Sequence, residues 1–268
     1  MQDTHSSSAG TLYVVATPVG NLKDITLRAI EVLRAVPLVA CEDTRSAGRL
    51  LAALDIRGPR FTSLFEHNEQ RKVEQLVEHL GAGHDAALIS EAGTPTISDP
   101  GYRLVARCRE AGIRVVPVPG PCAAVAALSA SGLPTDKFLF LGFPPRKGIR
   151  LARFLKRLAA PARTGIAYLP ARRLDEILGL LAESFPAARV VLARELTKKF
   201  EEFLSGSPAE LLQDVSSRPR KGECTLLVYR PGERGEDEEG EECELERNQE
   251  SGDTTEGEVG DGPGVTES

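Results

Sequence analysis

The chain of 268 residues is long enough to form one or two domains with buried cores, and its 41% apolar content is that of a soluble globular protein. Its five cysteines form no CxxC pair and no even-numbered framework, which excludes a disulfide-stabilised secreted domain and favours reduced thiols in a cytoplasmic protein. We expect no signal peptide and no membrane partner, because no apolar run is long enough to cross a bilayer.

The net charge of the chain is −6, but acidic and basic residues are concentrated in different parts of it. Residues 232–268 contain 15 Asp and Glu against 2 Lys and Arg, which leaves 24 Asp and Glu against 31 Lys and Arg in residues 1–231. The balance of the longer part, +7, suits a polyanionic partner such as nucleic acid, although many metabolic enzymes carry a similar one. Residues 232–268 have too few apolar residues to fold, so we expect a disordered acidic tail that aids solubility; an intramolecular mimic of RNA is the alternative.

Strand-like and helix-like patterns alternate after residues 1–10, a polar segment that we expect to be disordered. Strands are predicted at residues 11–16, 38–41, 61–65, 86–89 and 113–118. A helical pattern follows each strand; the first helix opens at Thr26, and the last, near Ala123, consists almost wholly of small residues. This alternation indicates a parallel sheet covered by helices, in an N-terminal α/β domain of residues 11–135.

Two of the loops that follow strands are rich in glycine and proline, at residues 17–24 and 90–101. Such loops leave backbone N–H and C=O groups free to meet a small ligand, and open α/β sheets bind their ligands at the carboxyl ends of strands. Asp99 is predicted to cap the following helix, with Pro100 at its first position. Ordinary connecting loops are the alternative interpretation.

A C-terminal α/β domain is predicted for residues 136–231, and residues 142–145 are predicted to form a hinge into it. Its strands are predicted at residues 138–140, 164–169, 189–193 and 224–229, with a hairpin through Phe203 and Leu204. A basic helix is predicted to open this domain, and its cations either form a solvated face or contact phosphates.

Several signatures of enzyme chemistry are absent from the sequence. GxGxxG, GxxxxGK[ST], GxSxG and HExxH do not occur, and the four histidines have no zinc-ligand spacing, so no metal is predicted. Stiff loops after successive strands suit a small ligand with a heteroaromatic base, held by main-chain hydrogen bonds and apolar walls. From the residues alone, the chain is predicted to be a cofactor-binding α/β enzyme.

Seven motifs in register, at residues 17–24, 41–45, 67–69, 91–101, 119–123, 193–198 and 221–223, resemble the ribosomal RNA small subunit methyltransferase I family of the tetrapyrrole methylase superfamily. The resemblance spans Thr11 to Tyr229. It implies two α/β domains of the class III methyltransferase type, with S-adenosyl-L-methionine in the cleft between them, and a cytoplasmic homodimer. The implied activity is 2′-O-ribose methylation of a cytidine in small-subunit (16S) ribosomal RNA, free or in the assembled small ribosomal subunit.

The resemblance also implies the residues that contact the cofactor. These are Pro18, Gly93, Thr94, Pro95, Ile97, Cys122, Ala123, Tyr168, Ala193 and Cys224. The chain departs from the family at residues 168–173, where it reads Tyr-Leu-Pro-Ala-Arg-Arg instead of Tyr-Glu-Ser-x-His-Arg. Arg173 is taken as the retained arginine, and the missing Glu and His put a catalytic role for this loop in doubt.

Methyl transfer to a ribose hydroxyl needs positioning and a group that takes the proton, so catalytic candidates are polar residues at loop ends. They are Glu42, Asp43, Arg45, His67, Asn68, Glu195, Lys198 and Glu223. A helix cap with an ion pair is the alternative for residues 42–45, and an i, i+3 surface pair for Glu195 and Lys198. The predicted RNA-binding cations are Lys23, Arg45, Arg49, Arg146, Lys147, Arg150 and Arg153.

Two rival functions are kept open at this point. A tetrapyrrole methylase acting on a corrin precursor would share the fold, but the basic residues and the motifs at 41–45 and 67–69 argue against it. A non-catalytic S-adenosylmethionine-binding module would keep the cofactor site without activity.

Overall fold

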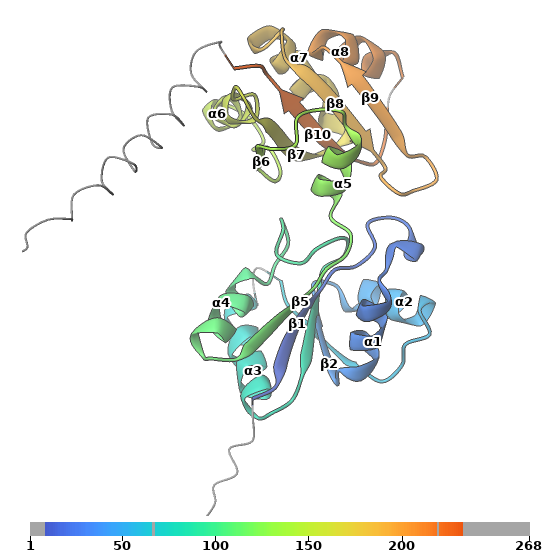
Figure 1. The fold of residues 1–268 in the computed structure, drawn as a ribbon, viewed down its shortest axis with the longest axis vertical. Helices are drawn as coiled ribbons and strands as arrows, with labels where there is room; N and C mark the ends of the chain where they lie inside the picture. Colours follow the sequence, from blue (N-terminus) through green and yellow to red (C-terminus); the bar gives the residue numbers. More distant parts are fainter. Residues whose placement is uncertain (1–8, 66–67, 219, 233–268) are drawn as a thin grey trace, which may run out of the picture. The chain divides into compact units, whose positions relative to one another are not determined.

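The computed structural model describes residues 9–65, 68–218 and 220–232. The described residues up to Arg230 belong to one compact unit that contains two five-stranded sheets (Figure 1). None of the helices in these ranges is long and apolar enough to cross a membrane.

The first sheet is entirely parallel, as the alternating pattern predicted. Its strands are β1 (Thr11–Val15), β2 (Leu38–Cys41), β3 (Arg60–Ser63), β4 (Ala86–Ile89) and β5 (Arg114–Val118). They lie in the order β3-β2-β4-β1-β5, with Leu12 of β1 opposite Ala86 of β4 and Val115 of β5. The third strand lies slightly earlier than predicted, ending at Ser63 instead of residue 65.

Helices cover both faces of this sheet (Figure 1). The helices are α1 (Leu27–Ala35), α2 (Thr44–Ala53), α3 (Glu69–Gly81) and α4 (Tyr102–Glu110), with a short 3-10 helix, η1 (Leu22–Asp24), before α1. Successive strand residues point to opposite faces. Val15 therefore packs in the cluster that contains α1 and α2, and Leu12 packs in the cluster that contains α3 and α4. As predicted, Thr26 caps α1, because its hydroxyl accepts the N–H of Ala29 at 3.1 Å.

The glycine- and proline-rich loops meet at one edge of the first sheet because its strands are parallel. Thr17, after β1, and Gly93, after β4, form an antiparallel bridge with hydrogen bonds of 2.9 and 3.0 Å. The bridge fastens the two loops together at the carboxyl ends of neighbouring strands, where the sequence predicted a ligand site.

The second sheet is mixed and mostly antiparallel. Its strands are β6 (Phe138–Phe140), β7 (Thr164–Pro170), β8 (Arg189–Arg194), β9 (Glu202–Gly206) and β10 (Glu223–Tyr229), in the order β6-β7-β10-β8-β9. Only the pair β6–β7 is parallel. The predicted hairpin through Phe203 and Leu204 is the pair β8–β9.

Helices α6 (Ile149–Leu158), α7 (Leu174–Ser184) and α8 (Pro208–Ser217) pack in one core on one face of this sheet. Helix α6 is the predicted basic helix, and it begins at Ile149. Arg146 and Lys147, which were predicted to belong to this helix, lie before it. Helix α5 (Ala123–Ala130) packs on the other face, against Ile166, Val191 and Leu227. The small residues of α5 therefore allow this helix to pack closely on the sheet.

Candidate functional site

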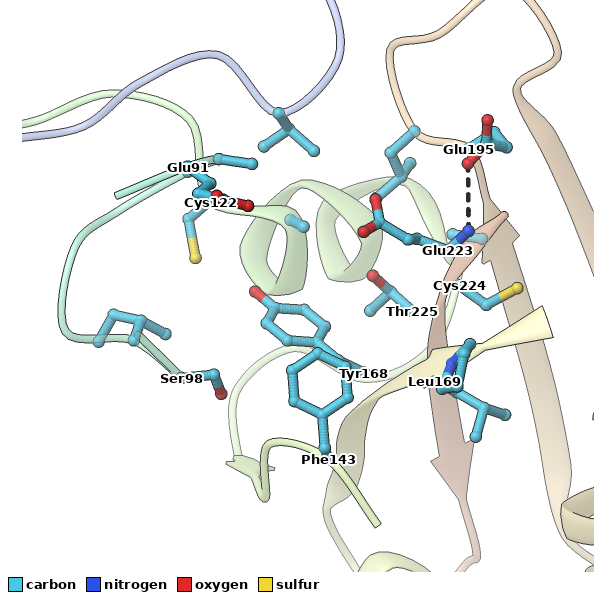
Figure 2. Close-up of a pocket in the computed structure, with 18 of the residues that line it drawn as sticks. Glu91, Ser98, Cys122, Phe143, Tyr168, Leu169, Glu195, Glu223, Cys224 and Thr225 are labelled. Atoms are coloured by element: carbon cyan, nitrogen blue, oxygen red, sulfur yellow. Dashed lines mark hydrogen bonds between the residues drawn. The ribbon is translucent and has the colours of Figure 1, made fainter. Parts of the chain in front are cut away.

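A cavity of about 430 Å³ is lined by loops that follow strands of the first sheet, by the start of α5 and by strand residues of the second sheet (Figure 2). Its volume lies within the range of small-molecule sites. The first half of the chain contributes the loop after β4, Val19 and the start of α5; the second half contributes the ends of β7, β8 and β10 and the segment that follows β6. The cavity therefore lies where the sequence predicted a ligand-binding edge.

Most of the residues predicted to contact the cofactor line this cavity: Gly93, Thr94, Ile97, Cys122, Ala123, Tyr168, Ala193 and Cys224. Pro18 instead lines a neighbouring cavity of about 50 Å³. Pro95 is buried and is not among the lining residues. The small side chains of Ala123 and Ala193 leave room beside the ring of Tyr168, a shape that suits a flat heteroaromatic ligand.

The loop at residues 90–101 is braced by its own polar side chains. The hydroxyl of Ser90 donates to the carbonyl of Gly93 at 3.1 Å, and that of Thr94 donates to Pro121 at 3.0 Å. Gly93 has φ +84°, and Thr96 and Ser98 also lie in the left-handed region, at +72° and +68°. Left-handed backbone at non-glycine residues is uncommon and clusters at functional sites. The loop therefore holds one defined shape against the cavity.

Three charged residues predicted as catalytic candidates form one cluster in the cavity wall. The ammonium of Lys198 lies 3.0 Å from carboxylate oxygens of both Glu195 and Glu223, and the backbone N–H of Glu223 donates to Glu195 at 3.1 Å. Figure 2 labels Glu195 and Glu223 among the residues that line the cavity. That N–H of Glu223, followed by Lys198, lowers the pKa of Glu195. Glu195 and Lys198 form the i, i+3 ion pair, but this pair lines a cavity and also includes Glu223.

A second acidic group lies at the edge of the first sheet. Asp99 lines the main cavity, and burial raises its pKa to about 6, with a further contribution from Glu42. Burial and the charge of Glu91 also raise the pKa of Glu42. Asp99 is therefore a carboxylate beside a ligand cavity with a pKa near neutral pH, as is typical of general bases.

The prediction that Asp99 caps the following helix is wrong. Helix α4 begins at Tyr102 after Gly101, whose φ is +114°. The N–H of Gly101 donates to the buried carboxylate of Glu69, at 3.2 Å, so a residue of another helix supplies the acceptor. Asp99 is consequently free of the capping role.

The motif at residues 42–45 contains the predicted cap and ion pair. Asp43 accepts the N–H of Arg45 at 2.8 Å and pairs with its guanidinium at 3.4 Å, and the Arg45 side chain is 88% exposed. Glu42 and Asp43 line the 50 Å³ cavity, together with Glu91 and Pro18. The motif thus borders the main site without forming part of its wall.

Asn68, in the motif at residues 67–69, forms hydrogen bonds within its own loop. The side-chain oxygen of Asn68 accepts the N–H of Phe65 at 3.0 Å, and its amide donates to the carbonyl of Ser63 at 3.1 Å. His67 lies outside the described residues. These bonds give Asn68 a role in shaping the turn after β3.

The predicted RNA-binding cations are exposed and fall into two groups. Lys23, Arg45 and Arg49 lie on η1 and α2, and the second group consists of Arg146, Lys147, Arg150 and Arg153 on and just before α6. Arg173, in the loop that departs from the family pattern, donates to the carbonyls of Pro144, Pro145 and Arg146, each at 3.0 Å. It thereby holds the segment that carries the second group.

Sequence reasoning missed several lining residues, among them Asp99, Phe143 and Arg172. Asp99 lies inside a recognised motif, and its position just before the helix misled the prediction. Phe143 was assigned only to a hinge. Within the described ranges, no group of three or more His, Cys, Asp or Glu could hold a metal ion.

Comparisons with known proteins define the class of this fold and site. The family model described as Tetrapyrrole (Corrin/Porphyrin) Methylases matches residues 11–212. A solved uroporphyrin-III-C-methyltransferase from Thermus thermophilus has a similar fold, with a TM-score of 0.57 at 24% identity; the match covers 82% of this chain and 94% of that one. The class is a methyltransferase of the tetrapyrrole methylase type.

Relatives with higher sequence identity identify the family within this class. Ribosomal RNA small subunit methyltransferase I of Escherichia coli O157:H7 is 51% identical over 228 residues, which cover 83% of this chain and 78% of the relative. The proteins of the same name from Vibrio cholerae and Pseudomonas aeruginosa are 48% and 50% identical; the matches cover 87% and 82% of this chain, and 82% and 79% of the relatives. The chain belongs to the ribosomal RNA small subunit methyltransferase I family within the tetrapyrrole methylases, and it is an enzyme.

Proposed function

We propose that this methyltransferase binds S-adenosyl-L-methionine in the cavity of Figure 2 and methylates the ribose 2′-hydroxyl of a cytidine in small-subunit ribosomal RNA. The proposal rests on two findings taken together. The chain has this cavity, and its relatives named ribosomal RNA small subunit methyltransferase I are about 50% identical to it. A tetrapyrrole substrate is less well supported, because the solved uroporphyrin methyltransferase is only 24% identical.

The lining residues fit the proposed cofactor in shape and in charge. Ala123, Ala193 and Tyr168 border a slot suited to an adenine ring, and the loop of Gly93 brings backbone close to the ligand. Glu91, Asp99, Glu195 and Glu223 surround the same cavity, and carboxylates suit a ligand with a positively charged sulfur and an ammonium group. Gly93, Thr94, Ile97, Cys122, Ala123, Tyr168, Ala193 and Cys224 would hold it.

The residues of the chain then have two tasks in the reaction. The cofactor supplies a methyl group on a positively charged sulfur, so no metal is needed to activate it. The Glu195–Lys198–Glu223 cluster fixes the position of two carboxylates in the wall, which orients the ligand. We assign to Asp99 the task of accepting the proton of the 2′-hydroxyl as its oxygen attacks, because Asp99 lines the cavity and has a pKa of about 6.

The RNA would be bound through its phosphates by the two groups of exposed cations described above. Either free ribosomal RNA or the assembled small subunit is compatible with this arrangement. Because the proposed substrate is ribosomal RNA, the enzyme would act in the cytoplasm. We propose a homodimer from the family resemblance; exposed apolar side chains such as Leu27, 79% exposed, are available for an interface.

The test supplies purified protein and labelled S-adenosylmethionine with one of two acceptors, small subunits from cells that lack the enzyme or a tetrapyrrole precursor, and a control reaction contains no acceptor. The proposal predicts label in the RNA of the subunits alone. Label in the tetrapyrrole would establish the rival methylase. Cofactor binding without transfer to either acceptor would indicate a non-catalytic module.

A further inference from the structure

We propose that Phe143 is the platform on which the target nucleobase stacks when its ribose enters the active site. The inference rests on the proposed function, and it assigns a base-binding role that the cofactor site leaves open. The class of ligand is a single, unstacked pyrimidine nucleotide within an RNA chain.

Phe143 lines the main cavity although 60% of its surface is exposed. It lies between β6 and α6, and Figure 2 shows its ring beside that of Tyr168 at the cavity. An aromatic residue that packs for stability is mostly buried, whereas Phe143 is mostly exposed although it lines a ligand cavity. The exposed ring is therefore available to a group that enters the cavity from solvent.

Other aromatic rings support Phe143 from behind. Its ring centroid lies 5.6 Å from that of Tyr168 with the planes tilted by 60°, and Tyr168 in turn meets Phe140 edge-on at 4.9 Å. The hydroxyl of Tyr168 accepts the N–H of Ala124 at 3.2 Å, which fixes the middle ring. Tilted contacts of this kind are favourable and hold the Phe143 ring in place.

The backbone that carries Phe143 is also fixed. Arg173 binds the carbonyls of Pro144, Pro145 and Arg146, and the carbonyl of Gly142 accepts the N–H of Tyr168 at 3.0 Å. Two consecutive prolines further restrict the chain after Phe143. A ring held in advance loses little conformational freedom when a ligand stacks on it, which favours binding.

Exposed cations follow the ring directly along the chain. Arg146 and Lys147 lie three and four residues beyond Phe143, and Arg150 follows at the start of α6. Aromatic rings combined with positive charge are typical of proteins that bind single-stranded RNA, where bases stack and phosphates pair. Enzymes that act on one nucleotide commonly take its base out of the helical stack. The arrangement provides both contacts for such a nucleotide.

The experiment compares Phe143→Ala, Phe143→Trp and the control Phe200→Ala on bare small ribosomal subunits. Phe200 is 66% exposed and is not among the lining residues, so it matches Phe143 in exposure but not in position. We expect Phe143→Ala to lower kcat/KM for the subunits by about 10-fold to 100-fold, the range that base stacking confers. The control and Phe143→Trp should stay within about threefold of the wild type, because tryptophan also stacks.

The affinity for S-adenosylmethionine, measured by calorimetry on the same proteins, separates the nucleobase from the cofactor. We expect it to change by less than about twofold in Phe143→Ala. A loss of cofactor affinity that matches the loss of activity would overturn the inference, since the ring would then contact the cofactor. Equal activity of Phe143→Ala and Phe200→Ala, or no rescue by tryptophan, would also overturn it. Wild-type protein that methylates no RNA would instead refute the proposed function on which the inference depends.

Discussion

Lys198 Nζ lies 3.0 Å from Glu223 Oε2, a contact that joins the turn after β8 to the first residue of β10. The same ammonium lies 3.0 Å from Glu195, so one cation holds two carboxylates at the cavity wall. Removing a partner from such a cluster leaves like charges unpaired near a ligand site. The geometry of the proposed cofactor site therefore depends on this turn.

Gly222→Ala is expected to disturb the cluster without touching any of its charges. Gly222 has φ +100°, and a Cβ there would overlap the carboxylate of Glu195. We predict cofactor affinity about 10-fold weaker by calorimetry, because a displaced carboxylate loses its bonds to Lys198 and Glu223. Gly112→Ala is the matched control, since Gly112 also has a positive φ, +69°, but has nothing within 4 Å of the Cβ position. Equal cofactor affinity in the two variants would contradict this account.

The pH dependence of kcat/KM should report the ionisation of Asp99. With a pKa of about 6 in the free enzyme, Asp99 is protonated at lower pH and cannot accept the hydroxyl proton, so kcat/KM should fall below pH 6. Asp99→Asn should lower kcat by about 10²-fold to 10⁴-fold. Glu42→Gln should move the acidic limb to lower pH, because removing a neighbouring negative charge favours ionised Asp99.

The measurement is a set of kcat/KM profiles against pH, with heat-denaturation midpoints as a check on folding. An acidic limb that persists unchanged in Asp99→Asn would assign the proton transfer to another group. A limb that stays in place in Glu42→Gln would contradict the proposed coupling between the two carboxylates.

Gly165→Ala is expected to destabilise the second half of the chain. A Cβ at Gly165, in β7, would overlap the carbonyl oxygen of Leu158 at the end of α6, and backbone cannot move aside as a flexible side chain can. We predict a free energy of unfolding lower by about 3 kcal/mol or more. Gly179→Ala, inside α7, has its nearest neighbour 4.0 Å from the Cβ position and should instead be neutral or stabilising by about 0.5–1 kcal/mol. Denaturant titrations of both variants give the comparison, and similar losses in the two would show that the close approach is not limiting.

The cations near α6 should contribute to RNA affinity through phosphate contacts. Reversing Arg146, Lys147 and Arg150 to glutamate together is predicted to weaken RNA binding and to reduce its log–log salt slope by about 2. Arg57, Arg60 and Arg114 provide a control with the same change of charge: they are exposed and lie at or just before the amino ends of β3 and β5, away from the ligand-binding edge. Filter binding between about 50 and 200 mM salt tests the difference. An unchanged slope in the first variant would show that these cations do not contact RNA.

Local sequence patterns were sufficient for much of the fold. Leu38–Cys41 and Ala86–Ile89 are short apolar runs covered on both faces, so their bounds were predicted correctly. Helix α8 was missed, although Ser207 and Glu210 form a capping box around Pro208 at its start. The antiparallel pairing of the second sheet could not be predicted from its strands, because pairing is decided by contacts between distant segments.

Part of the cavity lining was predictable from the family resemblance. The glycine and small residues at 93, 123 and 193 line the cavity as expected from the motifs. Asp99 was misread because Gly101, with a positive φ, is the N-cap residue of α4, and its N–H binds Glu69, which is distant in the sequence. The exposure of Phe143 depends on how Arg173 holds the neighbouring backbone, a tertiary contact without a local signature.

The central claim is ribose methylation, and the location of the transferred methyl group tests it most directly. Small subunits are labelled with tritiated S-adenosylmethionine, and their RNA is then hydrolysed with alkali, which cannot cleave next to a 2′-O-methylated ribose. The account predicts label in one alkali-resistant dinucleotide that begins with cytidine. Label released in mononucleotides would place the methyl group on a base and would contradict the account.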